Sequence, residues 1–121
     1  MTGRWYSRPV FPVTDVEKSL AFYIDKLGFR EVWRHVEDGE ILVAQIDQPG
    51  FEVLLSCQWP DKVGSALNFL SLDADVLRAA RIEFESRSVE VKDGWWGYKL
   101  AIVEDPDGNQ LLFPYPKDEQ E

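Results

Sequence analysis

The first half of the fold is decided by one stretch, Val13-Thr14-Asp15-Val16-Glu17-Lys18-Ser19-Leu20-Ala21-Phe22-Tyr23. Its start has the form of a capping box, in which Thr14 or Asp15 accepts an orphan backbone amide and Glu17 reaches back. Apolar side chains then recur at helical spacing, at Val16, Leu20, Phe22, Tyr23 and Leu27. Gly28 follows and supplies a stop, because glycine readily adopts the left-handed conformation that ends a helix. The stretch therefore predicts a helix that ends at Gly28.

Strand-forming residues flank this helix on both sides. A first strand is expected over residues 6–13, where Pro9 and Pro12 favour an edge or irregular position. Three more strands are expected over residues 29–36, 41–46 and 51–56, separated by the turn-forming segments 37–40 and 48–50. One strand, one helix and three further strands make a βαβββ unit.

The second half of the chain repeats this order with a period of about sixty residues. A strand is expected over residues 66–72 and a helix over residues 76–85, with Leu77, Ala80 and Ile82 facing inward. Three more strands are expected over residues 89–91, 98–103 and 110–115. The segments 92–94 and 105–109 are rich in turn-forming residues and are interpreted as breaks between strands.

The sequence therefore predicts an α+β fold built from two βαβββ modules, residues 6–56 and 66–115 of a single domain over residues 1–121. Each module alone would expose one face of its sheet to water. Two modules side by side are expected to form a curved mixed sheet, whose concave face makes a cavity for a ligand.

The composition excludes several kinds of partner. Thirteen basic and 22 acidic side chains give a net charge of −9, which repels nucleic acid and anionic membranes and attracts cationic ligands. Simple solubility is the alternative explanation of this charge. The single cysteine, Cys57, cannot form an intramolecular disulfide, which favours a reducing cytoplasm. The first ten residues lack the apolar run of a secretory signal, and no later run approaches the roughly 18 apolar residues of a membrane span.

Two motifs carry a resemblance to a known family. The first is the stretch 13–23, continued through Leu27-Gly28-Phe29, and the second is Asp105-Pro106-Asp107-Gly108-Asn109 with Gln110-Leu111-Leu112-Phe113. They resemble the first helix and the final hairpin of the vicinal-oxygen-chelate superfamily, which includes glyoxalase I, extradiol dioxygenases, fosfomycin-modifying enzymes and bleomycin resistance proteins. Leu54-Leu55-Ser56, Trp96-Gly97 and the acidic tail 117–121 resemble the bleomycin-binding branch. The resemblance implies the glyoxalase/bleomycin-resistance fold, a homodimer and a small-molecule ligand.

Enzymes of that superfamily hold a divalent metal through side chains at strand ends, commonly two His, Gln or Glu and a further Glu. The resemblance places Arg8, Leu67 (or a neighbour) and Leu112 at those positions in this chain. A cation and two apolar side chains cannot chelate a metal. A shift of one residue offers only Ser65, Asn68 or Phe113, which is still a poor set of donors. We therefore expect no metal, no cofactor and no catalytic residue.

Five tryptophans in 121 residues exceed the need of a small core, so some are expected to face a cavity and bind planar or cationic groups. The predicted ligand-binding residues are Trp33, Ser56, Trp59, Phe69, Trp96 and Gly97. The alternatives are core filling or a subunit interface for the rings, and a bond to its own backbone for the Ser56 hydroxyl. Trp5 is expected at an interface. His35, the single histidine, shares a strand face with Trp33 and is expected at a rim rather than as a catalytic base.

These interpretations favour a homodimeric, cytoplasmic protein that sequesters a cationic, partly aromatic antibiotic of the bleomycin type without a metal. Two alternatives stay open. One is a metal-dependent lyase or isomerase related to glyoxalase I, with ligands that this register misses. The other is a protein that binds an unrelated metabolite in a new pocket of the same fold.

Overall fold

The computed structural model describes residues 3–120, so Met1, Thr2 and Glu121 of the predicted domain and its acidic tail lie outside the described residues. The first module contains β1 (Val10–Pro12), α1 (Val16–Ala21), the π-helix η1 (Phe22–Lys26), β2 (Arg30–Glu37), β3 (Glu40–Gln48) and β4 (Phe51–Ser56). A 3₁₀ turn, η2 (Pro60–Lys62), leads to the second module. That module contains β5 (Leu67–Phe69), α2 (Ala74–Ser86), β6 (Lys92–Trp95), β7 (Lys99–Glu104) and β8 (Gln110–Pro114), followed by the 3₁₀ turn η3 (Lys117–Glu119).

Each module forms a four-stranded mixed sheet, and the strand order is the same in both. Sheet A has the order β1-β4-β3-β2, and sheet B has the order β5-β8-β7-β6. β1 runs parallel to β4 and β5 runs parallel to β8, whereas the other neighbours are antiparallel. The predicted α+β fold of two βαβββ modules is therefore confirmed.

Hydrogen bonding divides the expected curved sheet into these two smaller sheets. β1 and β5 are edge strands of only three residues each. Beside β1, the Pro12 carbonyl accepts hydrogen bonds from Gly64 N at 3.2 Å and from Asn109 Nδ2 at 2.9 Å, and both donors belong to loops. Pro12 has no backbone N–H, so this edge lacks a donor that a continuous ladder would use.

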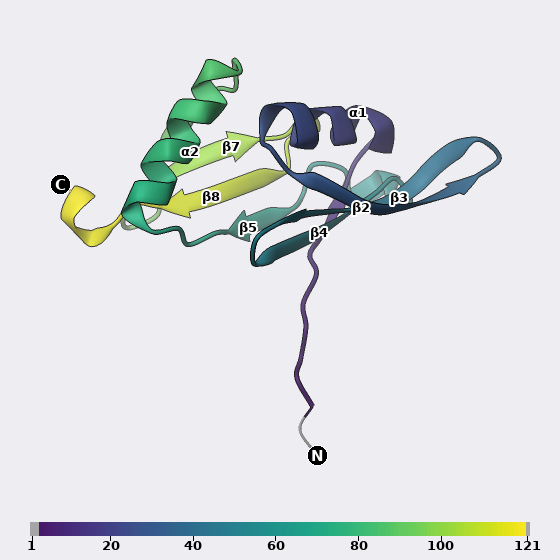
Figure 1. Ribbon diagram of the computed structural model, residues 1–121, viewed down its shortest axis with the longest axis horizontal. Helices are drawn as coiled ribbons and strands as arrows, with labels where there is room; N and C mark the ends of the chain where they lie inside the picture. The colour runs from purple at the N-terminus through teal and green to yellow at the C-terminus, as the bar shows by residue number, and fades with distance from the viewer. Residues whose placement is uncertain (1–2, 121) are drawn as a thin grey trace.

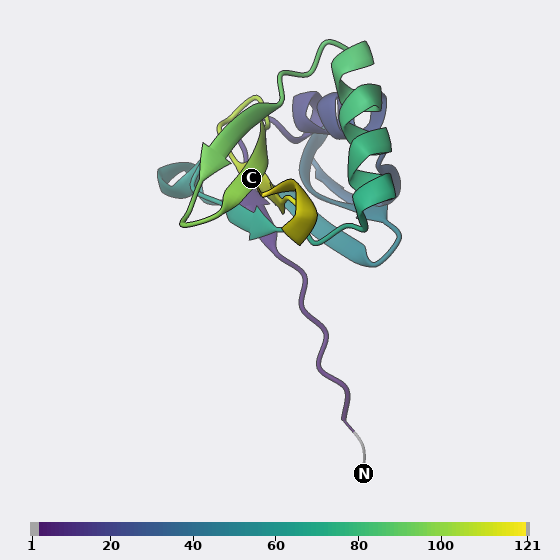
Figure 2. The same ribbon diagram turned by 90° about the vertical axis from the view of Figure 1, so that its left-hand side faces the viewer.

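Both helices lie on the same side of the two sheets (Figure 1). We call this side the helix face and the opposite side the open face. The N-terminal arm, residues 3–9, leaves the body on the open face and points away from it (Figures 1 and 2). The first strand is thus shorter than predicted, because residues 6–9 belong to the arm. The core fills the helix face, with Phe11, Ile46, Val53 and Leu55 of sheet A and Val103, Leu111 and Phe113 of sheet B among its buried side chains.

The first helix forms where the capping motif predicts it. The Asp15 side chain accepts a hydrogen bond from Lys18 N at 3.2 Å, whereas Thr14 Oγ1 donates to Asp107 Oδ1 of the second module at 2.7 Å. Beyond Ala21 the helix widens into η1, which buries Tyr23 completely. Gly28 ends the helical segment with a φ of +77°, a conformation that a side chain would strain.

One inward position of the second helix was predicted wrongly. Ile82 is 69% exposed, because it lies five residues after the buried Leu77 and therefore about 140° away around the helix. Phe84 lies seven residues after Leu77, close to two full turns, and packs against the core instead. The helix also begins at Ala74 rather than at residue 76.

The strand predicted over residues 89–91 and the break predicted over residues 92–94 are both wrong, since β6 covers Lys92–Trp95. Ser88 has a φ of +64° and Val89 N donates to Phe84 O at 2.9 Å, so residues 87–91 close the end of α2. Gly94 is not a turn residue here. A Cβ at this position would lie 2.6 Å from Ile102 Cδ1, so glycine permits close packing between β6 and β7.

A buried polar network joins the two modules. The Tyr23 hydroxyl donates to Asp105 Oδ2 at 3.0 Å, and Asn109 Nδ2 donates to the same oxygen and to the Pro12 carbonyl, each at 2.9 Å. Asp105 Oδ1 accepts the backbone N–H groups of Asp107 and Asn109, each at 2.9 Å. Burial raises the pKa of the Asp105 carboxyl, although these hydrogen bonds act in the opposite direction. Loop 105–109 therefore holds the first module against the second.

Removal of the Tyr23 hydroxyl should weaken this junction. We expect Tyr23→Phe to lower the free energy of unfolding by about 1–3 kcal/mol, because the buried Asp105 carboxyl loses one donor. Urea denaturation followed by circular dichroism measures the change. Tyr98→Phe is the matched control, because it removes the same atom from a residue that is 40% exposed. Equal losses in the two variants would contradict the role of the buried hydroxyl.

The raised pKa of Asp105 determines the sign of a pH effect. Between the ordinary carboxyl pKa of 3.8 and the raised value, the folded state binds more protons than the unfolded state. The contribution of Asp105 to the free energy of unfolding therefore falls as the pH rises through this interval. We expect the wild-type chain to lose stability relative to Asp105→Asn as the pH rises above about 4, measured by urea denaturation at each pH. A wild-type advantage that grows with pH would contradict this assignment.

Candidate functional site

The open face of sheet A carries Trp33. Side chains alternate along β3, so Ala44 and Ile46 lie in the core and Gln45 between them lies on the open face. Trp33 is the cross-strand partner of Gln45, and its Nε1 donates to Gln45 Oε1 at 2.8 Å. The indole is 44% exposed. Trp33 therefore presents a half-exposed aromatic ring with a fixed hydrogen bond.

His35 lies two residues farther along the same face, opposite Val43. Its Nε2 is 3.2 Å from Glu37 Oε2, and both side chains are more than half exposed. His35 is therefore an exposed side chain of the open face, and its imidazole contacts a carboxylate.

Three aromatic rings meet on the open face of sheet B. The Phe69 ring centroid lies 4.8 Å from that of Trp96 and 6.5 Å from that of Tyr98. Phe69 is paired with Leu112 of β8, whereas the neighbours of Leu112 on either side belong to the core of the helix face. The three aromatic residues are 40%, 51% and 40% exposed, in chain order. We call Phe69, Trp96 and Tyr98 the aromatic cluster.

A tight turn between β6 and β7 builds this cluster. Trp96 N donates to Tyr98 O at 2.9 Å, and Gly97 between them has a φ of +76°. That conformation costs a residue with a side chain about 1–2 kcal/mol, whereas glycine adopts it freely. Because the chain reverses over so few residues, Trp96 and Tyr98 both reach Phe69.

Polar contacts at the start of β6 support the turn. The Tyr115 hydroxyl donates to Asp93 Oδ1 at 2.8 Å, and Arg81 Nη1 of α2 donates to the same oxygen at 3.1 Å. The Tyr115 hydrogen bond is the largest cause of a lowered pKa at the Asp93 carboxyl, and Arg81 adds to it. The ionised carboxylate thus ties β6 to α2 and to the end of β8.

The other predicted residues lie apart from the aromatic cluster. Ser56 is 1% exposed, and its hydroxyl donates to Gln58 Oε1 and accepts from Gln58 N, each at 3.2 Å. Trp59 precedes η2 and is 45% exposed. No ring pair within residues 3–120 includes Trp33 or Trp59, so the structure joins only Phe69, Trp96 and, through the turn, Gly97.

Sequence reasoning missed two residues of this face, Tyr98 and Gln45. Tyr98 was read as part of a strand, although a glycine between two aromatics is a signal for a tight turn that brings both rings to one side. Gln45 stands among the apolar residues of β3, and an isolated amide in such a run is a sign of a buried hydrogen-bond partner.

The positions that the resemblance assigns to metal ligands do not offer a set of donors. Arg8 Nε donates to Glu52 Oε1 at 2.7 Å, Leu67 is 58% exposed on β5, and Leu112 is buried on β8. Within the part of the chain that the structure describes, no three His, Cys, Asp or Glu side chains form a group that could hold a metal ion. The side chains at these positions do not fit a divalent metal.

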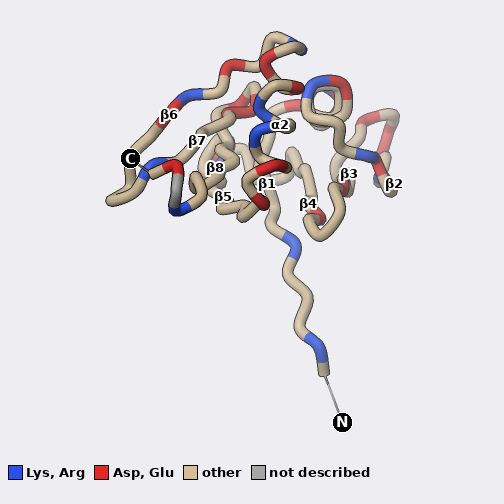
Figure 3. Tube along the Cα trace, turned by 60° about the vertical axis from the view of Figure 1, so that its left-hand side comes forward, with Lys and Arg blue, Asp and Glu red and all other residues tan. Residues whose placement is uncertain are grey.

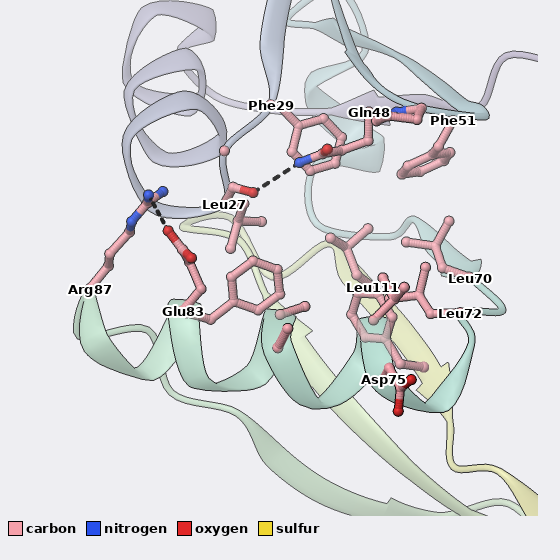
Figure 4. Close-up of a pocket in the computed structure, with 17 residues that line it drawn as sticks. Leu27, Phe29, Gln48, Phe51, Leu70, Leu72, Asp75, Glu83, Arg87 and Leu111 are labelled. Carbon is pink, nitrogen blue, oxygen red and sulfur yellow. Dashed lines mark hydrogen bonds and ion pairs between the residues drawn. The ribbon is translucent and has the colours of Figure 1, made fainter.

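A hollow, which we call the groove, lies on the helix face between the two modules. It measures about 790 Å³, and apolar side chains from both modules line it, among them Leu27, Phe29, Phe51, Leu70, Leu72 and Leu111 (Figure 4). Its lining contains no tryptophan and none of the six predicted ligand-binding residues. The groove and the aromatic cluster are therefore separate features on opposite faces of the sheets.

Charge is unevenly distributed along the chain. The arm carries Arg4 and Arg8 and no acidic residue, whereas acidic residues are spread over the body (Figure 3). Because the whole chain has a net charge of −9, the body alone is more acidic than this total. Such a body attracts cationic ligands at moderate ionic strength.

Known proteins share this architecture. Residues 5–113 match the Glyoxalase/Bleomycin resistance protein/Dioxygenase superfamily. A bleomycin resistance protein of Geobacillus stearothermophilus is 26% identical over an alignment of 126 positions, which covers 88% of this chain and 93% of that protein. TnmS3, an antibiotic binding protein from Streptomyces sp. CB03234, has a TM-score of 0.74 at 24% identity, over 97% of this chain and 100% of that chain. Lactoylglutathione lyase from Agrobacterium tumefaciens has a TM-score of 0.70 at 17% identity, over 99% of this chain and 100% of that chain.

The paired βαβββ modules place the chain in the glyoxalase-like class of folds. The chain belongs to the Glyoxalase/Bleomycin resistance protein/Dioxygenase superfamily. The two solved structures are less than 25% identical to it and establish the fold alone. Among residues 3–120, none of the helices combines the length and the apolar character needed to cross a membrane.

The turn at Gly97 can be tested by substitution. We expect Gly97→Ala to lower the free energy of unfolding by about 1–2 kcal/mol, because alanine is strained at a φ of +76°. Gly97→Asn should lose less, since asparagine tolerates this conformation better than alanine does. Urea denaturation measures both variants. Equal stability of the alanine variant and the wild type would show that the turn does not depend on the glycine.

Proposed function

We propose that this chain is a metal-free binding protein that sequesters a cationic, partly aromatic antibiotic of the bleomycin type. The aromatic cluster carries the proposal. Its rings touch one another and yet each residue stays 40–51% exposed, so flat surfaces are available to a planar group of a ligand. Similarity to bleomycin resistance proteins supports a binding role for a small molecule. A similar fold also serves in a protein described as antibiotic binding.

The charge of the chain supports a cationic ligand. A net charge of −9 raises the local concentration of cations near the body, and aromatic faces attract cations through their quadrupole. The two effects act on the same ligand when it carries both a positive group and flat rings. Bleomycin has both, with its bithiazole and its positively charged tail.

The side chains of the open face agree with a protein that binds its ligand without catalysing a reaction. Arg8, Leu67 and Leu112 occupy the positions where related enzymes carry metal ligands, and none of these side chains donates an electron pair to a divalent ion. His35 Nε2 lies 3.2 Å from Glu37 Oε2, and both side chains are exposed. A cytoplasmic location belongs to the proposal as well, because the single Cys57 suits a reducing compartment.

The proposal also includes a homodimer. Trp5 and Tyr6 of the arm are 98% and 76% exposed, and Leu67 at the edge of sheet B is 58% exposed. Apolar surface of this kind is commonly covered by a partner subunit. A second copy placed over the open face would enclose a ligand between the two chains, as expected from the resemblance.

Titration with bleomycin tests the binding role. Tryptophan emission should change and saturate, because Trp96 belongs to the aromatic cluster whereas the groove contains no tryptophan. Phe69→Ala should weaken binding about 2- to 10-fold in calorimetric titration, because a ring contact worth roughly 0.5–1.5 kcal/mol is lost. Trp95→Phe is the control, since Trp95 is 70% exposed beside the cluster and belongs to no ring pair of residues 3–120.

Other outcomes would overturn separate parts of the proposal. No change in emission up to high micromolar bleomycin would remove bleomycin as the ligand. Stoichiometric zinc, nickel, manganese or iron after extensive dialysis would favour a metal-dependent lyase or isomerase. A different compound that raises the Tm, where bleomycin does not, would favour an unrelated metabolite. A monomer in sedimentation experiments, with and without ligand, would exclude the homodimer.

A further inference from the structure

Trp33 is held by a chain of two hydrogen bonds that ends on a carboxylate. Its indole Nε1–H donates to Gln45 Oε1 at 2.8 Å, and Gln45 Nε2–H donates to Asp47 Oδ1 at 3.2 Å. Gln45 is 7% exposed, and the Asp47 side chain is 21% exposed. The Gln45 amide is therefore oriented from both ends, with its oxygen toward the indole and its nitrogen toward the carboxylate.

A β-bulge brings the Trp33 indole within hydrogen-bonding reach of Gln45. Glu31 pairs with Ile46 and the next cross-strand pair is Trp33 with Gln45, so Val32 is an extra residue on β2. In a regular ladder Trp33 would share a face with Glu31, whose partner Ile46 lies in the core. The bulge thus turns the indole to the open face and places it opposite Gln45, which accepts its N–H.

The Asp47 carboxylate, which ends this series of two hydrogen bonds, increases the attraction of the Trp33 ring for a cation. Hydrogen bonds in a partly buried site polarise one another, so Asp47 makes Gln45 Oε1 a stronger acceptor for the indole proton. An indole whose N–H is held in this way has more electron density on its faces, which attract cations. Arg30 Nη2 lies 4.0 Å from Asp47 Oδ2, but its side chain is 80% exposed, so water weakens that pair.

We propose that Gln45 and Asp47 are positioning residues that orient and polarise Trp33, and that Trp33 binds the cationic group of the ligand. The aromatic cluster then receives the planar group. This division of roles rests on the proposed function for the identity of the ligand. The hydrogen-bonded chain and its effect on the indole exist without any ligand and are tested separately.

The five indole Nε1–H resonances of the ¹⁵N-labelled full chain report on the hydrogen bonds directly. Trp33→Phe identifies the Trp33 resonance by its loss. We expect Asp47→Asn to move this resonance upfield and to speed its exchange with water, because the Gln45 acceptor becomes weaker. Gln45→Leu should have a larger effect, and unchanged positions of the other four resonances would show that each variant is folded.

Glu52→Gln is the matched control for Asp47→Asn. Glu52 is the cross-strand neighbour of Asp47 and carries the same charge, but its carboxylate is bonded to Arg8. The control variant should leave the Trp33 resonance in place. A Trp33 resonance that does not move in Asp47→Asn, or that moves equally in both variants, would overturn the positioning role.

Two probes of equal shape test the binding of a cation. Choline carries a trimethylammonium group, and 3,3-dimethylbutan-1-ol has the same shape without the charge. We expect choline to shift the Trp33 resonance more than the alcohol does, and its apparent Kd to rise about 2- to 5-fold in Asp47→Asn relative to Glu52→Gln. Equal responses to both probes, or shifts confined to other indoles, would overturn the role of Trp33. Retained choline binding without bleomycin binding would remove only the proposed antibiotic.

Discussion

The arrangement of the two modules depends on one buried carboxylate. Asp105 accepts four hydrogen bonds, from the Tyr23 hydroxyl, the Asn109 amide and two backbone N–H groups of its own loop. A second contact, from Thr14 Oγ1 to Asp107 at 2.7 Å, holds the start of α1 to the same loop. The open face exists because these bonds hold both sheets with their helices on one side. The aromatic cluster and Trp33 then lie on the other side.

Much of this framework follows from local sequence signals. The capping motif at residues 14–17, the stop at Gly28 and the turn residues 105–109 each act over a few positions, so they could be recognised without the structure. The errors arise where tertiary packing decides. Gly94 lies in β6, where the lack of a side chain lets Ile102 of β7 approach closely, and Ile82 is exposed because Phe84 takes the inward position.

The candidate site was only partly predictable for the same reason. Phe69 and Trp96 were expected at a ligand, but their contact joins residues 27 positions apart and depends on how Gly97 turns the chain. Tyr98 enters the cluster through that same turn. Periodicity alone could not show which face Trp33 occupies, because the bulge at Val32 shifts the alternation along β2. The lack of electron-pair donors for a metal at Arg8, Leu67 and Leu112 follows from residue type alone and needs no structure.

The extra residue at Val32 also has an evolutionary consequence. Glu31 and Trp33 already face the partners that two consecutive residues of a regular ladder would face, so loss of Val32 alone would remove the bulge and leave Trp33 opposite Gln45. A one-residue insertion or deletion at this position is therefore absorbed locally, and the side chains on the open face of sheet A keep their places. The length of β2 can thus vary here without a change in the surface that it offers to a ligand.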